Sequence, residues 1–385
     1  MPAFRTFDAE RFLRETWQKR PLLIRDPWQS WENPLDPEEL AGLACEPDIE
    51  SRLVRNVGAK EWELEHGPLK AKRFEELDTC PWTLLVQAVD HQVPAVAALI
   101  DPFRFIPNWR IDDVMVSYAV AGDGVGPHFD QYDVFLVQGA GRRRWKVGPR
   151  CDGSARLLPH DDLRLLADFE PVGEWVLGPG DILYVPPGFA HDGVAVGDDC
   201  MTYSIGFRAP SRGDLISGWA DHAIDTLAED DRYTDAQLPI GANPGEISST
   251  ALSRLQGMVL DALGDPNEFA RWFGEYVTVP KDDRLDWSPE TPVSVADLTP
   301  AASGPIWFER NPASRFSFIR ADSGPFLLFV DGVSYECSGA VMSVAERMCA
   351  SDRFAVHAEE IDAANVAELL VALVNSGCIA VEDPA

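Results

Sequence analysis

The stretch from about residue 110 to 208 most constrains the fold of this chain, because it is a series of short β-type runs separated by Gly and Pro turns. Strands at this regular spacing are typical of an antiparallel sandwich or a jelly roll. The runs 133–138 and 142–147 flank a glycine-containing turn at 139–141, which predicts a hairpin. We therefore expect an antiparallel jelly roll here.

The regions on either side have different patterns. Residues 8–20 place apolar side chains at helical spacing, and the segment after Pro210 does the same until about 278. A linker rich in Pro and Asp covers 280–300. The pattern of the tail predicts a small α/β module. Together with the separate β-rich and helical regions before it, this predicts an α+β fold class. The predicted parts of the tail are strands near 315–320 and 326–337, with helices near 341–350 and 364–376.

Composition indicates an ordinary folded protein with an acidic surface. Of the 385 residues, 45% are hydrophobic and 25% charged, and the formal net charge is -30. The acids are spread along the chain, which disfavours nonspecific binding to nucleic acid or to an anionic membrane. A basic partner remains open, and so does a solvated acidic surface with no particular ligand.

The cysteines and the apolar runs favour a cytoplasmic protein. No apolar run approaches the ~20 residues of a membrane span, and no apolar signal core follows the N-terminus. The cysteines lack the short paired spacings of a disulfide framework or a zinc knuckle, so they are interpreted as reduced thiols. They are Cys45, Cys80, Cys151, Cys200, Cys337, Cys349 and Cys378.

Two motifs inside the β-rich region supply side chains that bind metals. His128 and Asp130 are two positions apart, so on an extended segment they project from the same face. His191 follows a Pro-Pro-Gly turn at the start of a later strand. Two imidazoles and one carboxylate are the ligands typical of non-haem Fe(II) oxygenases, which keep coordination positions open. The set therefore predicts a catalytic metal site.

The triplet 142–144 contains an arginine that alternation turns inward. With a period of two, Arg143 shares a face with Trp145 and Val147, whereas Arg142 and Arg144 face the other side. A buried arginine needs an anionic partner, and its planar fork suits a carboxylate held by two parallel hydrogen bonds. A bound carboxylate ligand and a structural ion pair to an internal acid remain equally open from the residues alone.

Longer motifs resemble the bacterial JmjC-type ribosomal oxygenases, and the likeness covers nearly the whole chain. The three longest lie at 124–145, 180–191 and 204–210, and shorter ones lie at 17–25, 271–276 and 372–377. The resemblance implies a JmjC/cupin double-stranded β-helix in residues 1–210. It also implies a helical dimerisation domain with a linker at 211–300 and a winged-helix-like domain at 301–385.

The resemblance also implies an activity and a set of site residues. Members of that family hydroxylate an arginine of ribosomal protein uL16, at C3, with Fe(II), 2-oxoglutarate and O2. His128, Asp130 and His191 resemble the iron ligands, Arg143 resembles the residue that binds the distal carboxylate of 2-oxoglutarate, and Ser117 looks like a further contact. Ala119 stands where a second serine is expected in related members. A homodimer is implied as well.

Several alternatives stay open at this point. The same ligands could serve histidine, lysine or small-molecule hydroxylation, or a non-catalytic cupin, because the ligands set the oxidant and not the target. Asp123 and Asp133 could select a cationic arginine at the mouth of the site, or could be ordinary loop acids. The acidic tail from 351 opposes DNA binding. The other histidines are interpreted as structural: His66, His91, His160, His222 and His357.

Overall fold

The chain folds into two compact units, Met1–Ala209 and Pro210–Ala385. In this computed structural model no described helix is both long and apolar enough to cross a lipid bilayer. The division into 1–210, 211–300 and 301–385 stays a prediction. The described residues are 2–58, 60–77, 81–236, 240, 243–281, 285–298, 304–320, 325–361 and 363–382.

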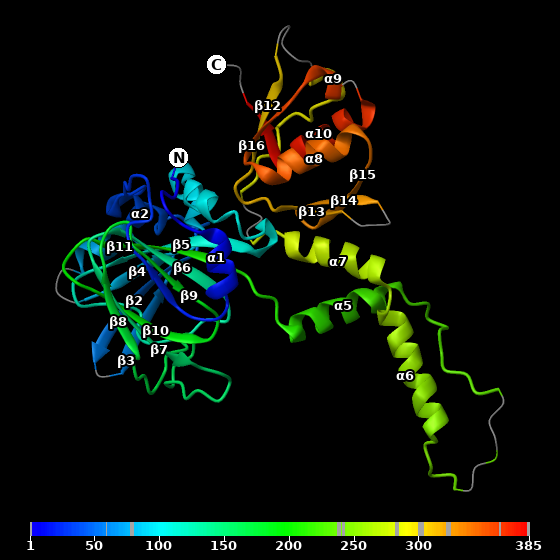
Figure 1. The fold of residues 1–385 in the computed structure, drawn as a ribbon, viewed down its shortest axis with the longest axis horizontal. Coiled ribbons are helices and arrows are strands. Elements are labelled where there is room, and N and C mark those ends of the chain that lie inside the picture. The colour runs from blue at the N-terminus through cyan, green and yellow to red at the C-terminus, as the bar shows by residue number, and fades with distance from the viewer. Residues whose placement is uncertain are drawn as a thin grey trace. The chain divides into compact units, whose positions relative to one another are not determined.

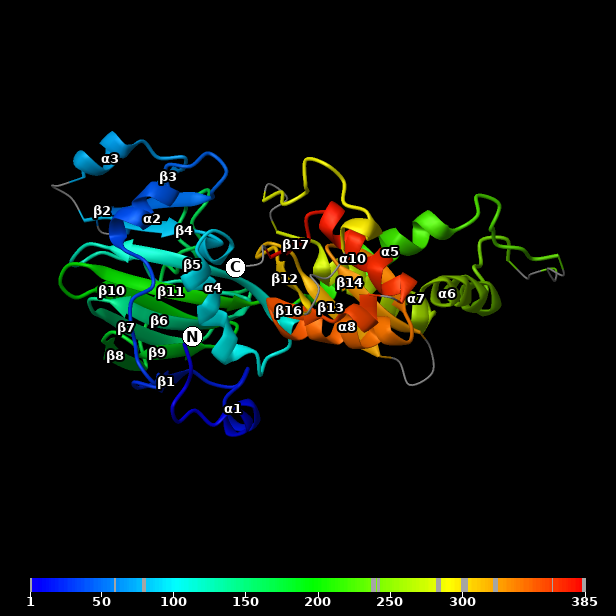
Figure 2. The same cartoon turned by 90° about the horizontal axis from the view of Figure 1, so that it is seen from above.

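Two antiparallel sheets build the first unit (Figures 1 and 2). The larger has the order β1-β9-β6-β11-β5-β4-β2-β3 and the smaller the order β10-β7-β8. The strands are β1 (Leu22–Ile24), β2 (Ser51–Gly58), β3 (Glu61–His66), β4 (Thr83–Val86), β5 (Ile111–Ala119), β6 (Asp133–Ala140), β7 (Arg143–Arg150), β8 (Gly173–Leu177), β9 (Ile182–Val185), β10 (Phe189–Ala195) and β11 (Cys200–Phe207).

The central strands of the larger sheet are buried on both faces, as β6 illustrates. Val134 and Leu136 join a cluster with Trp145 and Val147 of the smaller sheet. The alternate side chains, such as Phe135, join the main core formed with the N-terminal helices. Because both faces are covered, β6 is almost continuously apolar, which is the pattern expected of a strand buried on both sides. The site lies between the two sheets.

The predicted hairpin between 133–138 and 142–147 is wrong. β6 pairs with β9 and β11 in the larger sheet, whereas β7 pairs with β8 and β10 in the smaller one. The turn carries the chain from one sheet to the other, and Gly141 adopts a φ of +61° there. Local turn residues specify a change of direction, but the partner of each strand is decided by the apolar faces that the two sheets bury against each other.

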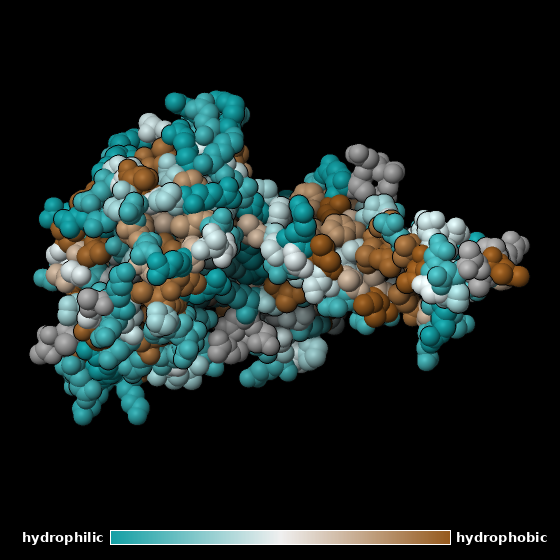
Figure 3. Space-filling view, turned by 90° about the horizontal axis from the view of Figure 1, so that it is seen from below, coloured by the Kyte–Doolittle hydropathy of each residue, from teal (hydrophilic) through white to brown (hydrophobic). Residues whose placement is uncertain are grey.

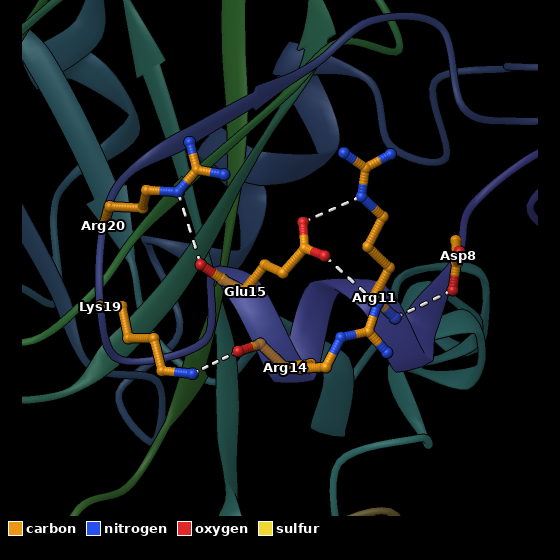
Figure 4. A network of polar contacts seen from close by, with 6 residues as sticks. All are labelled: Asp8, Arg11, Arg14, Glu15, Lys19 and Arg20. Carbon is orange, nitrogen blue, oxygen red and sulfur yellow. Dashed lines mark hydrogen bonds and ion pairs between the residues drawn. The ribbon is translucent and has the colours of Figure 1, made fainter.

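Short helices cover the outer face of the larger sheet. Asp8 caps α1 by accepting from the backbone N–H of Arg11, and Glu15 pairs with Arg11 and Arg14 on its exposed side (Figure 4). The opposite side buries Phe12 in the main core. The helices are α1 (Ala9–Glu15), α2 (Pro37–Leu43), α3 (Ala71–Glu75), α4 (Pro94–Ala97) and the 3-10 turns η1 (Val89–His91), η2 (Ala98–Phe103) and η3 (Asn108–Arg110).

The second unit combines helices with two small antiparallel sheets. Helix α7 packs against the sheet β13-β14-β15, while α8 and α10 help to form a second apolar core. The second sheet has the order β16-β12-β17. The elements are α5 (Arg212–Thr226), α6 (Ser249–Leu263), α7 (Pro266–Thr278), η4 (Val295–Asp297), β12 (Ile306–Arg310), β13 (Phe316–Arg320), β14 (Phe326–Val330), β15 (Val333–Cys337), α8 (Ala340–Ala350), β16 (Arg353–Val356), α9 (Ala358–Ile361), α10 (Ala364–Asn375) and β17 (Ile379–Val381).

The cysteines agree with the sequence-based interpretation where they are described. Cys80 lies outside the described residues. None of the other six is bridged to another described cysteine, and burial raises the pKa of Cys349 to about 12 and that of Cys378 to about 11. These thiols are therefore protonated and unreactive near neutral pH.

Candidate metal centre

Two backbone segments bring the three predicted ligands together between the sheets. His128 and Asp130 lie in the loop that follows β5, and His191 lies near the start of β10, as its turn predicts. The backbone N–H of His128 donates to the carbonyl of His191 at 3.0 Å, and the reverse bond measures 2.8 Å. The N–H of Gly188 donates to the carbonyl of Asp130 at 2.7 Å. Main-chain bonds alone therefore bring the two motifs into contact.

The side chains converge at the atoms that could bind a metal. Asp130 Oδ2 lies 3.8 Å from His128 Nε2 and 3.5 Å from His191 Nε2. One ligand atom from each residue lies within 4.8 Å of the other two, and the described residues contain no second group of this kind. These spacings suit a single ion placed among the three atoms.

Hydrogen bonds fix the tautomer of both imidazoles. Nδ1 of His128 lies 2.8 Å from the carbonyl of Gly126, and Nδ1 of His191 lies 3.0 Å from the carbonyl of Phe189. A carbonyl oxygen can only accept, so each Nδ1 carries the proton and each Nε2 keeps its lone pair for a metal.

Burial differs among the three groups, and two of them are partly exposed. The side chain of His191 is 2% exposed, whereas those of His128 and Asp130 are 23% and 22% exposed. Burial, helped by the neighbouring His128, lowers the pKa of His191 to about 4, against the opposing effect of Asp130. His191 is therefore neutral near pH 7, the form in which an imidazole binds a metal.

Arg143 points inward from β7, as alternation predicts, and is 4% exposed. No described acid lies within ion-pair distance of its guanidinium, so the structural ion pair that the sequence left open is absent from the described residues. Nη1 instead donates to Ser117 Oγ at 3.0 Å and to Thr202 Oγ1 at 3.3 Å. A buried cation that donates hydrogen bonds only to hydroxyl oxygens, with the Trp145 ring 5.5 Å away, is prepared for an anionic ligand.

Sequence reasoning missed Thr202. Alternation along 200–207 would have indicated it, because Met201 and Tyr203 lie in the outer core and their neighbour must face the other way. Ala119, where a second serine was expected, is fully buried beside Ala195 and Cys200 and has no side-chain donor. The second hydroxyl that Arg143 contacts is therefore that of Thr202.

The two acids considered for substrate selection are both buried. Asp133 accepts hydrogen bonds from Tyr184 at 2.6 Å and from Gln18 and Arg110, both at 2.9 Å, so it is a structural anchor and not a mouth residue. Asp123 is 2% exposed and accepts from Thr83 Oγ1 at 3.3 Å. Burial raises the pKa of Asp123 to about 6.

Family models match both units of the chain. A model described as a JmjC domain matches residues 98–215, which include all three candidate ligands. A second, described as a ROXA-like winged helix, matches residues 260–380. The second match begins inside α6, so it takes in α7 together with the sheet that α7 covers.

Curated relatives cover most of the chain. Ribosomal protein uL16 3-hydroxylase of Escherichia coli is 43% identical over 287 residues, which make up 74% of this chain and 75% of that protein. A Haemophilus influenzae protein described as a probable ribosomal oxygenase is 38% identical over 274 residues, which make up 70% of this chain and 67% of that protein.

Solved structures have the same fold over the full length. The X-ray structure of E. coli YcfD matches with a TM-score of 0.87 at 35% identity and covers 99% of this chain and 100% of that one. A structure of YcfD, a ribosomal oxygenase, in complex with cobalt and 2-oxoglutarate matches with a TM-score of 0.86 at the same identity and covers all of both chains.

Proposed function

The chain belongs to the ribosomal oxygenases with a JmjC domain, and we propose that it hydroxylates C3 of an arginine side chain in ribosomal protein uL16, using Fe(II), 2-oxoglutarate and O2. The observation that carries the proposal is the convergence of His128, Asp130 and His191 on one point, with His128 and Asp130 partly exposed. Two imidazoles and one carboxylate fit Fe(II).

The mechanism assigns a separate task to each part of the site. Bound Fe(II), 2-oxoglutarate and O2 together supply the oxidation that replaces a C–H bond by C–OH and yields succinate and CO2. His128 and His191 hold their Nε2 lone pairs toward the metal position because each Nδ1–H is bound to a carbonyl. The carboxylate of Asp130 offsets part of the positive charge that Fe(II) brings to the site.

Arg143 is proposed to bind the distal carboxylate of 2-oxoglutarate. Its guanidinium is buried, positively charged and has no acid within ion-pair distance among the described residues, so a dianionic ligand gains a charge-assisted hydrogen bond there. Ser117 orients Arg143 by accepting from Nη1. Arg143 and the metal site thus fix the two ends of 2-oxoglutarate.

Mass spectrometry of a uL16 peptide incubated with the purified protein tests the proposal. We expect a single peptide to gain the mass of one oxygen atom, on arginine, only when Fe(II) and 2-oxoglutarate are both present. Succinate should form in equal amount. A His191→Ala variant with full turnover would refute the catalytic assignment. Modification of a histidine or lysine instead would keep the oxygenase and replace the target.

The helices of the second unit support a proposed homodimer. Helix α6 has no buried residue, although Leu252, Leu255 and Val259 lie along one side of it and are exposed. Hydrophobic side chains gather in this helical part of the surface in Figure 3. A second copy would cover this stripe. Light scattering should give the dimer mass for the native chain and the monomer mass for a Leu255→Asp variant.

We also propose domain boundaries for the second unit, a role for the tail and a cellular location. Residues 211–300 and 301–385 would form the helical and winged-helix-like domains of the second unit. The tail from residue 351 contains more acids than bases, so we propose that it contacts protein and does not bind DNA directly. A ribosomal protein substrate supports a cytoplasmic location.

A further inference from the structure

A row of polar side chains crosses the inner face of the larger sheet. Thr202 of β11 pairs in register with Ser117 of β5 on one side and with Gln138 of β6 on the other. All three are buried, although the faces of these strands are otherwise largely apolar. Arg143 reaches this row from the smaller sheet. Three neighbouring strands therefore supply one polar strip opposite one cation.

The hydrogen bonds along this row have a defined direction. Nε2 of Gln138 donates to the carbonyls of Ala140 at 2.7 Å and Met201 at 3.0 Å, so its Oε1 must face away from them. Thr202 Oγ1 lies 3.3 Å from that Oε1, which can only accept. The hydroxyl proton of Thr202 therefore points to Gln138, and its lone pairs are left for Arg143.

The hydroxyl of Ser117 is oriented in the same way, because it also donates to a protein oxygen and accepts from Arg143. It donates to the carbonyl of Thr202 at 3.4 Å, so its oxygen accepts from Arg143 Nη1. Both hydroxyls thus present lone pairs to Nη1. Because Nη1 has two protons, these two bonds use both of them.

The remaining nitrogens of Arg143 are not equivalent. Nε is sealed from solvent and has no partner among the described residues. Nη2 also has no described partner, but it is not sealed, so it is the nitrogen that a ligand can reach. The sequence predicted two parallel hydrogen bonds from the guanidinium to a carboxylate. They would need two accessible nitrogens, and in this arrangement only Nη2 is accessible.

We propose that Thr202 and Gln138 are positioning residues for the co-substrate. Gln138 sets the direction of the Thr202 hydroxyl, Thr202 and Ser117 hold Nη1, and Nη2 is thereby aimed at the distal carboxylate of a 2-oxo acid. This inference rests on the proposed function and adds a specificity determinant to it. The preorganised guanidinium selects a ligand with a second carboxylate because binding does not have to reorient the arginine.

The test compares two ligands that differ only at the distal end. Calorimetry on the full-length, Mn(II)-loaded protein measures the affinity for 2-oxoglutarate and for 2-oxopentanoate, which lacks the distal carboxylate. We expect Thr202→Val to weaken binding of 2-oxoglutarate about tenfold and to leave binding of 2-oxopentanoate unchanged. Thr202→Ser, which keeps the hydroxyl, should stay within about twofold of the native affinity.

A second comparison tests the relay from Gln138. Gln138→Leu should weaken 2-oxoglutarate binding by about threefold, and the double variant with Thr202→Val should bind no more weakly than Thr202→Val alone, because both changes remove the same oriented hydroxyl. Additive losses would overturn the relay. If the valine variant does not fold, Thr202→Ala gives the same comparison.

The outcomes separate this inference from the proposed function. Equal losses for both ligands in Thr202→Val, or a Thr202→Ser variant as weak as Thr202→Val, would overturn the positioning role while the oxygenase assignment stands. A native protein that binds neither 2-oxo acid in the presence of Mn(II) would overturn both.

Discussion

The metal end and the arginine end of the site are held in different ways. At the metal end, His128 and His191 exchange two main-chain hydrogen bonds, and each ring is fixed by a carbonyl two residues earlier in its own motif. At the arginine end, Arg143 is held by side chains of β5 and β11, which lie 26 and 59 positions away in the chain. The first end is built mostly from local backbone and the second from long-range side-chain contacts.

This difference indicates how each end should respond to substitution. Side chains at the metal end contribute ligand atoms, and the backbone arrangement does not depend on them. At the arginine end, the side chains themselves determine the orientation of the guanidinium. Substitutions should therefore separate metal affinity from co-substrate affinity.

Removing a ligand at the metal end should have the largest effect. His191→Ala deletes one of three ligand atoms, so we expect Mn(II) affinity to fall more than about a hundredfold and 2-oxoglutarate turnover to disappear. Metal titration and succinate assays measure both quantities. His66→Ala, at an exposed histidine outside the metal group, is the matched control and should behave like the native protein.

Removing the guanidinium at the other end should affect the co-substrate alone. Arg143→Ala should raise the KM for 2-oxoglutarate about tenfold to a hundredfold, because a charge-assisted hydrogen bond is lost, while Mn(II) affinity stays native. Arg144→Ala is the control, since Arg144 lies on the same strand but is exposed and pairs with Glu174. Equal losses of metal and co-substrate affinity would contradict the separation of the two ends.

The buried Asp123 should make stability depend on pH. Its pKa of about 6 in the folded protein is higher than the ordinary 3.8, so the unfolded chain releases this proton first. Its contribution to stability is fully present below pH 3.8 and is lost as pH rises to about 6. Urea unfolding at pH 7 should therefore find Asp123→Asn more stable than the native chain by on the order of 2 kcal/mol. The prediction would be contradicted if the stability difference between Asp123→Asn and the native chain were the same at pH 4 and at pH 7.

Gly193 packs against Trp145, between the two ends of the site, and should tolerate no added side chain. A Cβ there would lie 2.6 Å from ring atoms of Trp145, the residue that pairs with Gly193 and lies between Arg143 and His191. We expect Gly193→Ala to lower the free energy of unfolding by about 1 kcal/mol or more. Gly257→Ala in α6, where nothing lies within 4 Å, should not destabilise the protein. Thermal unfolding compares the two variants.

The sequence predicted the strands far better than their pairing. The runs at 133–138 and 142–147 correspond to β6 and β7, but the hairpin between them was wrong because the two strands belong to different sheets. The strands β12, β16 and β17 were not predicted, since strands of only three to five residues carry little periodicity.

The candidate metal ligands and the inward direction of Arg143 could be predicted from the sequence, because motif spacing and strand alternation are local properties of the chain. The contacts of Thr202 with Arg143 and Gln138, and the burial of Asp133 as an anchor, became visible only in the folded structure. Those neighbours come from strand register and from the packing of two sheets. Such contacts join residues far apart in sequence, and no local pattern specifies them.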